Sequence, residues 1–387
     1  RSFKYPQVFR ISLGVDQKLP YDLFLTIDGL YSKTLNNILY KNIKYVENGS
    51  FVKEGGSVER AYYKQAYPSS IKNFNDIILL DNTNKGYSWS VSAQLTKKFN
   101  FGLSAMAAYT YGVSKSINDG TSSQALSNWK YNYVYSKSNS PELSYSSFDM
   151  RNRVIGNIGY THKWGKISST TVSIFYTGFS GRPYTLNYNY TSGQKGVVGA
   201  SASINGDYQT GNDLMYIPTD AELQVMKTNG QFQPITDKSG NVIVSVEAMV
   251  EGLKTLYSNN DYMKNHRGEY AKRNGARTPW ENQFDFHFAQ DFFVSVGKHT
   301  HTLQLTFDVL NVANLINSDW GKSYDIKYNV PVVSFIGFKP TTPGGSVADY
   351  NMPVFQYNPS AFKNNQTYVE SDFFSRWRGQ IGIRYTF

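Results

Sequence analysis

The stretch WRGQIGIRYTF, Trp377–Phe387, decides the fold of this chain because its side chains alternate between two characters. The apolar members are Trp377, Ile381, Ile383, Tyr385 and Phe387, and the polar members between them are Arg378, Gln380, Arg384 and Thr386. Successive side chains of a β-strand point to opposite faces, so one face of this segment suits lipid and the other suits water. The pattern, with its cationic polar face and terminal phenylalanine, predicts the closing strand of an outer-membrane β-barrel.

The composition of the whole chain agrees with this interpretation. The 387 residues include 31 Tyr and 24 Phe and only 18% charged residues, which excludes a disordered segment. No run of about 18 apolar residues is present, which excludes a helical membrane protein. There is no cysteine, so disulfide frameworks and thiolate metal sites are excluded as well.

Nine segments show two-sided alternation over a length that can cross a membrane as a tilted strand. They lie at about 9–15, 23–31, 87–96, 103–111, 154–161, 171–176, 284–288, 302–309 and 377–387. The fold class that follows is all-β, an antiparallel transmembrane β-barrel.

The lengths of the connections predict how the barrel is oriented. Four connections are short turns, and the others, at about 34–85, 115–148, 183–281 and 314–372, are long. Barrels keep short turns in the periplasm and long loops outside, which places the C-terminus on the periplasmic side. Because single-chain bacterial barrels have an even strand number, nine strands predict an N-terminal portion that precedes Arg1, and the first residues contain no targeting segment.

The connection 183–281 loses the strand periodicity and shows two helical patterns, so we expect a large structured extracellular loop. Thr219 and Glu222 have the spacing of a capping box, and apolar residues recur at helical intervals from Val246 to Tyr257. The apolar faces of these helices must pack on the loop itself, on the barrel rim or on a partner.

Several short motifs resemble the C-terminal barrel half of TonB-dependent transporters, most of all the Oar-like branch of Bacteroidota and myxobacteria. They are PQVFR (Pro6–Arg10), SGRPY (Ser180–Tyr184), DLMYIP (Asp213–Pro218), RGEYAKRNG (Arg267–Gly275), WENQFD (Trp280–Asp285) and FDVLNVAN (Phe307–Asn314). The resemblance covers residues 1–387 and implies a barrel of about 22 strands closed by an N-terminal plug. Nine strands would then leave about thirteen for the missing part.

The resemblance also extends to a C-terminal signal read by the barrel assembly machinery. Its members are Gln380, Gly382, Tyr385 and Phe387. Strand addition at an open edge would explain how such a segment is recognised, with the two aromatic side chains supplying contacts.

Charged residues on the water-facing side of the nine segments are candidates for a lumen lining. They are Arg10, Asp28, Arg153, Asp285, His287, Asp308, Arg376, Arg378 and Arg384. Together with a net charge of +10, they could attract lipopolysaccharide or an anionic substrate, or pair with one another and with the plug.

Catalytic and metal-binding motifs are weak in this sequence. The five histidines have no nucleophile-elbow or zincin spacing, so we expect no enzyme activity, no cofactor and no catalytic metal. His299 and His301 form a pair in a predicted turn. An acidic cluster that contains Asn205, Asp207, Asn212 and Asp213 could hold calcium but lacks the EF-hand pattern.

The function expected from the resemblance is TonB-dependent transport across the outer membrane of a Gram-negative bacterium, with a cargo that the sequence does not identify. The expected partners are lipid and lipopolysaccharide, the missing barrel and plug segment, the TonB complex, the barrel assembly machinery and a possible surface lipoprotein, with no nucleic acid. Three alternatives stay open: a passive porin or adhesin barrel, an outer-membrane hydrolase, and a SusC-like glycan importer that works with the lipoprotein.

Overall fold

The computed structural model describes residues 3–55, 59–65, 74–191, 203–297, 299–326, 329–340 and 350–387. Nine long strands form one antiparallel sheet in which each strand pairs with the next along the path β1-β2-β6-β7-β9-β10-β17-β18-β23. All nine predicted strands are confirmed. Their bounds are β1 Gln7–Leu19, β2 Leu23–Asn42, β6 Tyr87–Lys98, β7 Leu103–Ser116, β9 Asn152–Trp164, β10 Ser168–Phe179, β17 Glu281–Val296, β18 His299–Leu310 and β23 Arg378–Thr386.

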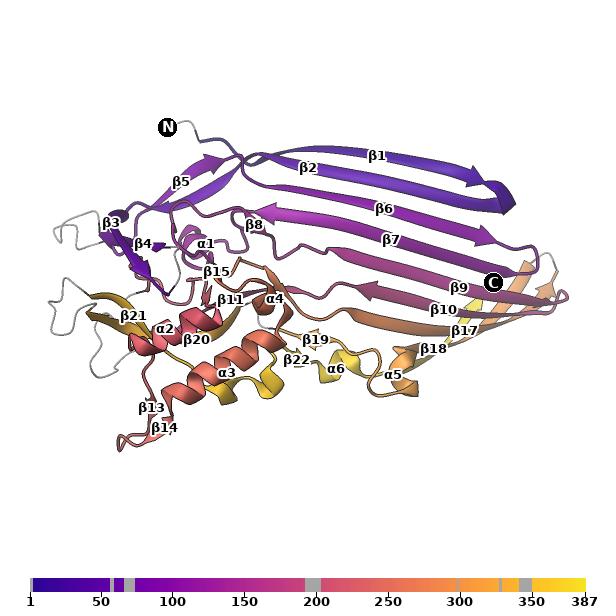
Figure 1. Cartoon of the computed structure of the whole chain (residues 1–387). Helices are drawn as coiled ribbons and strands as arrows, with labels where there is room; N and C mark the ends of the chain where they lie inside the picture. Colours follow the sequence, from indigo (N-terminus) through magenta and orange to yellow (C-terminus); the bar gives the residue numbers. More distant parts are fainter. Residues whose placement is uncertain are drawn as a thin grey trace.

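The sheet is long, curved and open at both edges (Figure 1). The short turns lie at one end of the strands, and the long connections gather at the other end, as their lengths predicted (Figure 1). The tight turn after β1 is the 3₁₀ segment Pro20–Asp22, in which Tyr21 has a φ of 65°. In the described part of the chain, no helix is long and apolar enough to cross a membrane.

Most of the long connections fold together into a compact body, which we call the cap, at the end of the strands opposite the short turns. We use the name outer end for this end of the sheet, after the predicted orientation. Its larger helices are α2 Asp220–Thr228 and α3 Val246–Asn259, and the shorter ones are α1 Ala125–Lys130 and α4 Asp261–Asn265. Its strands are β3 Tyr45–Lys53, β4 Glu59–Gln65, β11 Pro183–Tyr190, β12 Tyr216–Ile217, β13 Ile235–Thr236, β14 Val242–Val244, β15 Glu269–Tyr270, β16 Ala276–Arg277, β20 Asn329–Pro340 and β21 Tyr350–Gln356. Two short strands, β5 Ile78–Thr83 and β8 Ser144–Tyr145, pair with β2 and β7 of the sheet. The last long connection contributes α5 Val312–Ile316 and α6 Asp372–Ser375, which lie beside β17 and β18 (Figure 1), and the strand pair β19 Tyr324–Asp325 and β22 Val369–Glu370.

Both predicted helices form, and their caps explain where they begin. Thr219 accepts a hydrogen bond from the backbone N–H of Glu222, whose carboxylate accepts from the Thr219 N–H, which completes the expected capping box of α2. At the start of α3, the Ser245 side chain accepts from the Ala248 N–H. These caps satisfy backbone donors that the first turn of a helix leaves unpaired.

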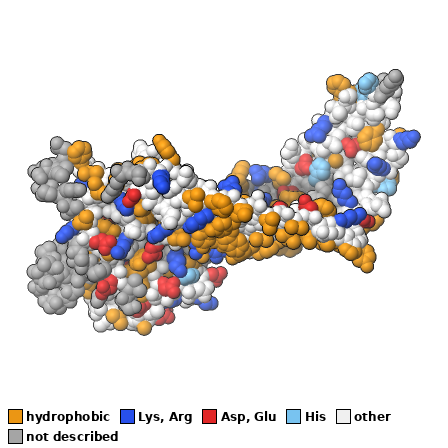
Figure 2. Space-filling model, turned by 90° about the horizontal axis from the view of Figure 1, so that it is seen from above, with side chains coloured by type: hydrophobic (Ala, Val, Ile, Leu, Met, Phe, Trp, Pro, Cys, Tyr) orange, Lys and Arg blue, Asp and Glu red, His pale blue; other side chains and the backbone are white. Residues whose placement is uncertain are grey.

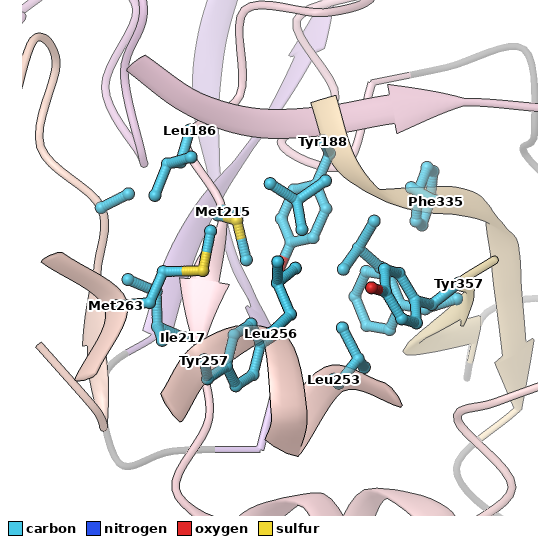
Figure 3. Packing of buried hydrophobic residues seen from close by; sticks show 14 of the residues in the cluster. Leu186, Tyr188, Met215, Ile217, Leu253, Leu256, Tyr257, Met263, Phe335 and Tyr357 are labelled. Carbon is cyan, nitrogen blue, oxygen red and sulfur yellow. The ribbon is translucent and has the colours of Figure 1, made fainter. Parts of the chain in front are cut away.

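The apolar faces of α2 and α3 are buried inside the cap, so the self-packing alternative is the one that the structure favours. Leu253 and Leu256 of α3 are directed toward the same interior as Tyr188 of β11 and Phe335 of β20 (Figure 3). Val52 of β3 belongs to the same cluster. The folded unit is therefore broader than the loop 183–281, because other long connections also contribute to its core.

A parallel strand pair joins distant parts of the chain within the cap. β11 pairs in parallel with β20, and β20 pairs with β21 in the opposite direction. Parallel pairing requires a long crossover, which the connection between these segments supplies. The cap is thus a tertiary structure of its own, built on the outer ends of the sheet.

We predict that Leu223→Ala in α2 destabilises the cap by about 2–5 kcal/mol, because it leaves a cavity at a fully buried position. Val225→Ala in the same helix is the matched control, since Val225 is 52% exposed. Hydrogen exchange of the purified protein in detergent should show faster exchange in α2 and α3 for the first variant only. Equal exchange in both variants would contradict the packing described above.

Candidate functional site: the polar face of the sheet and the cap above it

One face of the sheet carries most of the sequence-predicted lumen residues, because the register is continuous across neighbouring strands. Arg10 lies opposite Ser32, and Asp28 lies opposite both Gly14 and Ser92. Residues directly opposite each other in an antiparallel pair point to the same face. The same reasoning through the pairs of β7, β9, β10, β17, β18 and β23 places Arg153, Asp285, His287, Asp308, Arg378 and Arg384 on this face.

Asp285 and Asp308, two of the predicted carboxylates on this polar face, have polar partners. His287 Nδ1 and Asp308 Oδ1 lie 2.5 Å apart, and Asp285 Oδ1 accepts from the Asn311 N–H at 2.8 Å. Asp291 accepts hydrogen bonds from Ser169 and Gln304. The His287–Asp308 contact supports the mutual-pairing interpretation, whereas Asp285 and Asp291 accept from uncharged groups.

The arginines on this face are less engaged. Arg10 donates to the Ser32 hydroxyl at 3.2 Å, and the guanidinium of Arg378 lies over the Phe373 ring, 5.0 Å from its centroid. Within the described part of the chain, Arg153 and Arg384 make no hydrogen bond or salt bridge. The wall therefore presents cationic groups that remain available to another molecule or segment.

Arg376 was predicted to face the lumen because of strand alternation, but it lies outside the strand. β23 begins at Arg378, one residue later than the predicted strand at Trp377, and Arg376 is the residue that ends α6. Strand alternation therefore does not apply to Arg376, which is exposed at the outer rim rather than placed on the lumen face by register. The residues Asp372–Ser375 form the short helix α6, so the alternation of side chains between two faces begins only with β23 at Arg378.

The four residues of the expected assembly signal lie on the last strand or directly after it. Gln380 and Gly382 are on the polar face, opposite Asp308 and Thr306, and Tyr385 is on the other face, opposite Leu303. Tyr385 stacks on Phe387, with ring centroids 5.9 Å apart. β23 pairs only with β18 among the described strands, so its other edge is exposed. The recognition of this segment by the assembly machinery stays a prediction.

The opposite face of the sheet is a continuous apolar surface. Phe9, Val91, Ile174, Phe286 and Ile381 lie on it, and Val91, Ile174 and Ile381 are among its exposed large side chains. Figure 2 shows hydrophobic side chains along the outer face of the sheet, with charged side chains and histidines on the concave side. An exposed apolar surface of this extent is unstable in water but stable in hydrocarbon.

Comparison with known proteins decides the family. The sequence model of the outer membrane beta barrel domain matches residues 1–323. The chain belongs to this outer membrane β-barrel family. No curated protein and no solved structure matches it. The apolar face of the barrel sheet is therefore its lipid-facing surface, and the polar face is its lumen wall.

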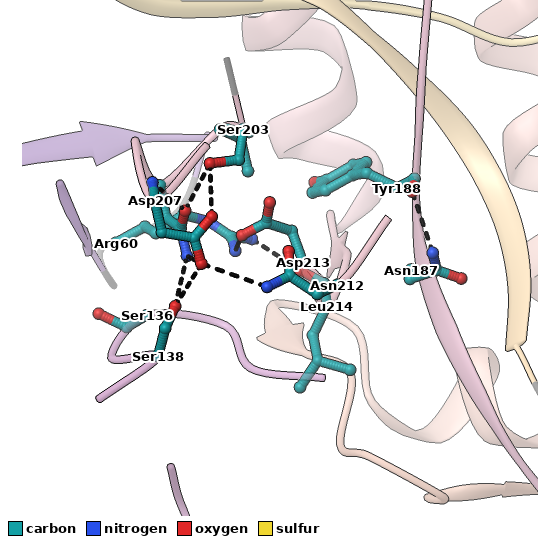
Figure 4. A network of polar contacts seen from close by, with 12 residues as sticks. Arg60, Ser136, Ser138, Asn187, Tyr188, Ser203, Asp207, Asn212, Asp213 and Leu214 are labelled. Carbon is teal, nitrogen blue, oxygen red and sulfur yellow. Dashed lines mark hydrogen bonds and ion pairs between the residues drawn. The ribbon is translucent and has the colours of Figure 1, made fainter. Parts of the chain in front are cut away.

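A buried ionic network holds the barrel's cap together and involves a residue that the sequence analysis did not single out. Arg60 is fully buried and donates to Glu54 at 2.6 Å, to Asp213 at 3.0 Å and to the Leu214 carbonyl at 2.6 Å (Figure 4). Its guanidinium also lies 4.9 Å from the centroid of the Tyr270 ring. Nothing local in the sequence marks Arg60, since Asp213 is 153 residues away.

The same network explains the acidic cluster that was considered as a calcium site. Asp207 accepts hydrogen bonds from Ser138, Ser203, Asn205 and Asn212, so protein donors occupy its oxygens (Figure 4). Asp213 is paired with Arg60 and accepts from the Tyr190 hydroxyl. Among the residues that the structure describes, no group of three or more His, Asp or Glu side chains could hold a metal. The side chains of these acidic residues connect segments of the cap to one another.

The charges of the network perturb each other strongly. Burial raises the pKa of Asp213 to about 8, which Arg60 opposes and the negative charge of Asp207 reinforces. Burial alone would lower the pKa of Arg60, but the charges of Glu54 and Asp213 raise it well above its ordinary value. The guanidinium therefore stays charged, and Asp213 is the group that titrates in the accessible range.

A cleft of about 370 Å³ lies between the segments 133–144 and 268–273 of the cap. Tyr135 stacks on Tyr270 in its wall, with ring centroids 4.8 Å apart, and Lys137 and Glu142 also line it. Ser144, another lining residue, lies opposite Ser116 at the end of β7. In the alternation of β7, Ser116 belongs with the residues that face the lumen. One wall of the cleft is therefore continuous with the end of β7.

We predict that a charge on the lipid-facing side destabilises the folded barrel, whereas the same charge one residue later does not. Val91→Arg faces hydrocarbon and should cost about 2–4 kcal/mol, and Ser92→Arg faces the lumen and should change stability little. Urea unfolding of the protein in lipid vesicles, followed by the mobility of the folded form in gels, measures both. Equal losses for the two variants would contradict the assignment of the faces.

We also predict that the cap loses stability as the pH rises. The pKa of Asp213 is about 8 in the folded protein and 3.8 in the unfolded chain. The contribution of Asp213 to the stability of the cap is therefore complete below pH 3.8 and is lost as the pH rises through about 8. Hydrogen exchange of the cap at pH 6 and pH 9, corrected for the intrinsic rate, measures the change. Asp213→Asn should remove most of it, whereas Asp237→Asn on the exposed β13–β14 turn should not.

Proposed function

We propose that this chain supplies the wall and the outer cap of a TonB-dependent transporter whose barrel contains further strands and a plug. The sequence motifs that resemble the Oar-like branch support this proposal, and membership of the outer membrane β-barrel family is compatible with it. In such a transporter, force from the inner-membrane TonB complex shifts the plug, and cargo passes along the wall. The barrel itself needs no covalent chemistry.

The observation that carries the proposal is the open sheet. β1 pairs only with β2 and β23 only with β18 among the described strands, so two edges have unpaired backbone groups. Each such group costs several kcal/mol in hydrocarbon, so the sheet must be completed by other strands. A small barrel would close on itself and fill its interior with side chains, whereas this wall belongs to a wide barrel that needs a plug.

Three apolar side chains on the lumen wall support a plugged lumen over an open one. Met106 of β7 and Phe175 of β10 lie on either side of Asn157 of β9 on the polar face, and Ile155 is the next residue of β9 on that face. Porin interiors are polar because they contain water. Half-buried apolar side chains at this place are better satisfied by a protein segment, and the available arginines nearby could pair with its carboxylates.

The orientation and the remaining partners follow from the same proposal. The short turns would lie in the periplasm and the cap outside the cell, where the cleft beside Tyr135 could meet cargo before it enters the lumen. Lipopolysaccharide, the barrel assembly machinery and a surface lipoprotein are the further partners that we propose.

Uptake and conductance measurements on the full-length protein test this function. We predict that the intact barrel, in a planar lipid bilayer, has no steady conductance, because the plug fills the lumen. In cells, disruption of this gene and loss of TonB should abolish uptake of the same nutrient, and the double mutant should be no worse than either single mutant.

Other outcomes would favour the alternatives. Steady conductance together with TonB-independent uptake would indicate a passive porin and overturn the proposal. A surface lipoprotein that copurifies with the barrel and is required for uptake of a glycan would indicate the SusC-like mode within the same transport class.

A further inference from the structure

A second cleft lies on the lipid-facing side of the sheet, at the outer end of β17. Its volume is about 300 Å³. The lining residues that matter here are Trp280, Asn282, Phe284, Ala313, Trp320 and Lys322. Asn282 and Phe284 share the parity of Phe286 and Phe288, which places this wall of the cleft on the lipid face. The cleft is thus separate from the lumen and from the cap interior.

The contacts of Trp280 confirm the side on which the cleft lies. A Cβ added at Gly178 would lie 3.0 Å from the Trp280 ring, and Gly178 has the same parity as Ile174 and Tyr176 on the lipid face. The indole N–H of Trp280 and the Tyr176 hydroxyl both donate to Asn282 Oδ1, at 2.9 and 2.7 Å. Amphipathic aromatic rings of this kind are typical of the interface between hydrocarbon and headgroups.

The segment that follows β18 forms the other wall. α5 lies beside the outer ends of β17 and β18 (Figure 1), and it contributes Ala313 to the cleft. Next to the cleft, Ile316 is 72% exposed and Trp320 is 54% exposed. These two large, exposed apolar side chains add to the apolar surface at the outer end of β17 and β18.

The mouth of the cleft has one cationic group. Lys322 Nζ lies 3.0 Å from Glu370 and 3.1 Å from Asp319. An ammonium group has three N–H donors, so these two contacts leave one for a further acceptor. An apolar pocket with one or two polar groups at its mouth is the usual form of a small-molecule site.

We propose that this cleft binds a membrane lipid, with an acyl chain against Phe284, Ala313 and Trp320 and the polar headgroup at the charged mouth formed by Lys322, Asp319 and Glu370. Continuity with the lipid-facing surface of the sheet identifies the occupant, because the cleft is an indentation of that surface. Lipid A and a glycerophospholipid share the required chemistry, and the experiment distinguishes them. The site does not depend on the transport proposal, since any barrel with this rim would have it.

Native mass spectrometry of the full-length protein, extracted from outer membranes and washed with detergent, tests the site directly. We predict that the wild-type protein retains one tightly held lipid, and that Ala313→Trp, which fills the cleft, lowers its occupancy at least fivefold. Ala107→Trp is the matched control, because Ala107 is exposed on the same face, on β7, outside the cleft. Lys322→Gln should lower the occupancy severalfold and leave the apolar wall intact.

The mass of the retained lipid identifies its source as lipid A or a phospholipid. A wild-type protein that retains no lipid, or an Ala313→Trp variant that retains as much as Ala107→Trp, would overturn the proposal. Since Ala313→Trp could also disturb folding, a second measurement uses Trp320→Phe, which keeps an aromatic wall.

Acyl chains brominated near the headgroup should quench a fraction of the tryptophan fluorescence of the wild-type protein in vesicles, and Trp320→Phe should reduce that fraction. If aqueous iodide quenches Trp320 and brominated chains do not, the rim lies outside the membrane and no lipid site exists. Neither readout requires transport activity, so this inference can fail while the proposed function stands, and the reverse also holds.

Discussion

The structure depends on one constraint, which is that backbone N–H and C=O groups in hydrocarbon must pair with each other. The nine strands of the sheet meet it with a register that is continuous across every neighbouring pair, apart from one irregularity at Gln7. Because side chains alternate with a period of two, a slip of one residue would exchange the lipid face and the lumen face. The backbone ladder therefore fixes which side chains see lipid, and the assignment of the lumen wall and of the lipid cleft follows from it.

The same constraint explains which parts of the molecule could be predicted from the sequence. A strand that crosses the membrane has its own local pattern, and the capping box at Thr219 is contained within four residues, so both could be recognised directly. The cap could not be predicted in this way, because its order comes from contacts between distant segments, such as the pair of β11 with β20 and the bonds of Arg60. The role of Asp213 could not be predicted for the same reason, because its partner Arg60 is 153 residues away in the sequence.

Charged groups have different roles in the two halves of the molecule. In the cap, Arg60 is removed from water and each of its contacts must be made, because an uncompensated charge at such a place costs several kcal/mol. On the lumen wall the groups are partly exposed, and a pair such as His287–Asp308 contributes little to stability. Pairing within the wall does not account for Arg153 and Arg384, which have no hydrogen-bond or salt-bridge partner among the described residues. Under the proposed function, these arginines would contact the plug or the cargo.

The way the cap is attached bears on how a transport path could open. Asp149 is buried and accepts from the Ser114 N–H at 2.5 Å and from Arg277, which ties the cap to the outer end of β7. Arg273 donates to the Ile117 carbonyl and to Ser116 at the end of the same strand. To swing outward as a lid, the cap would have to break these contacts of Asp149 and Arg273 with β7 and its end. A cap held in this way supports the transport mechanism proposed above, in which the moving part is a plug in the lumen.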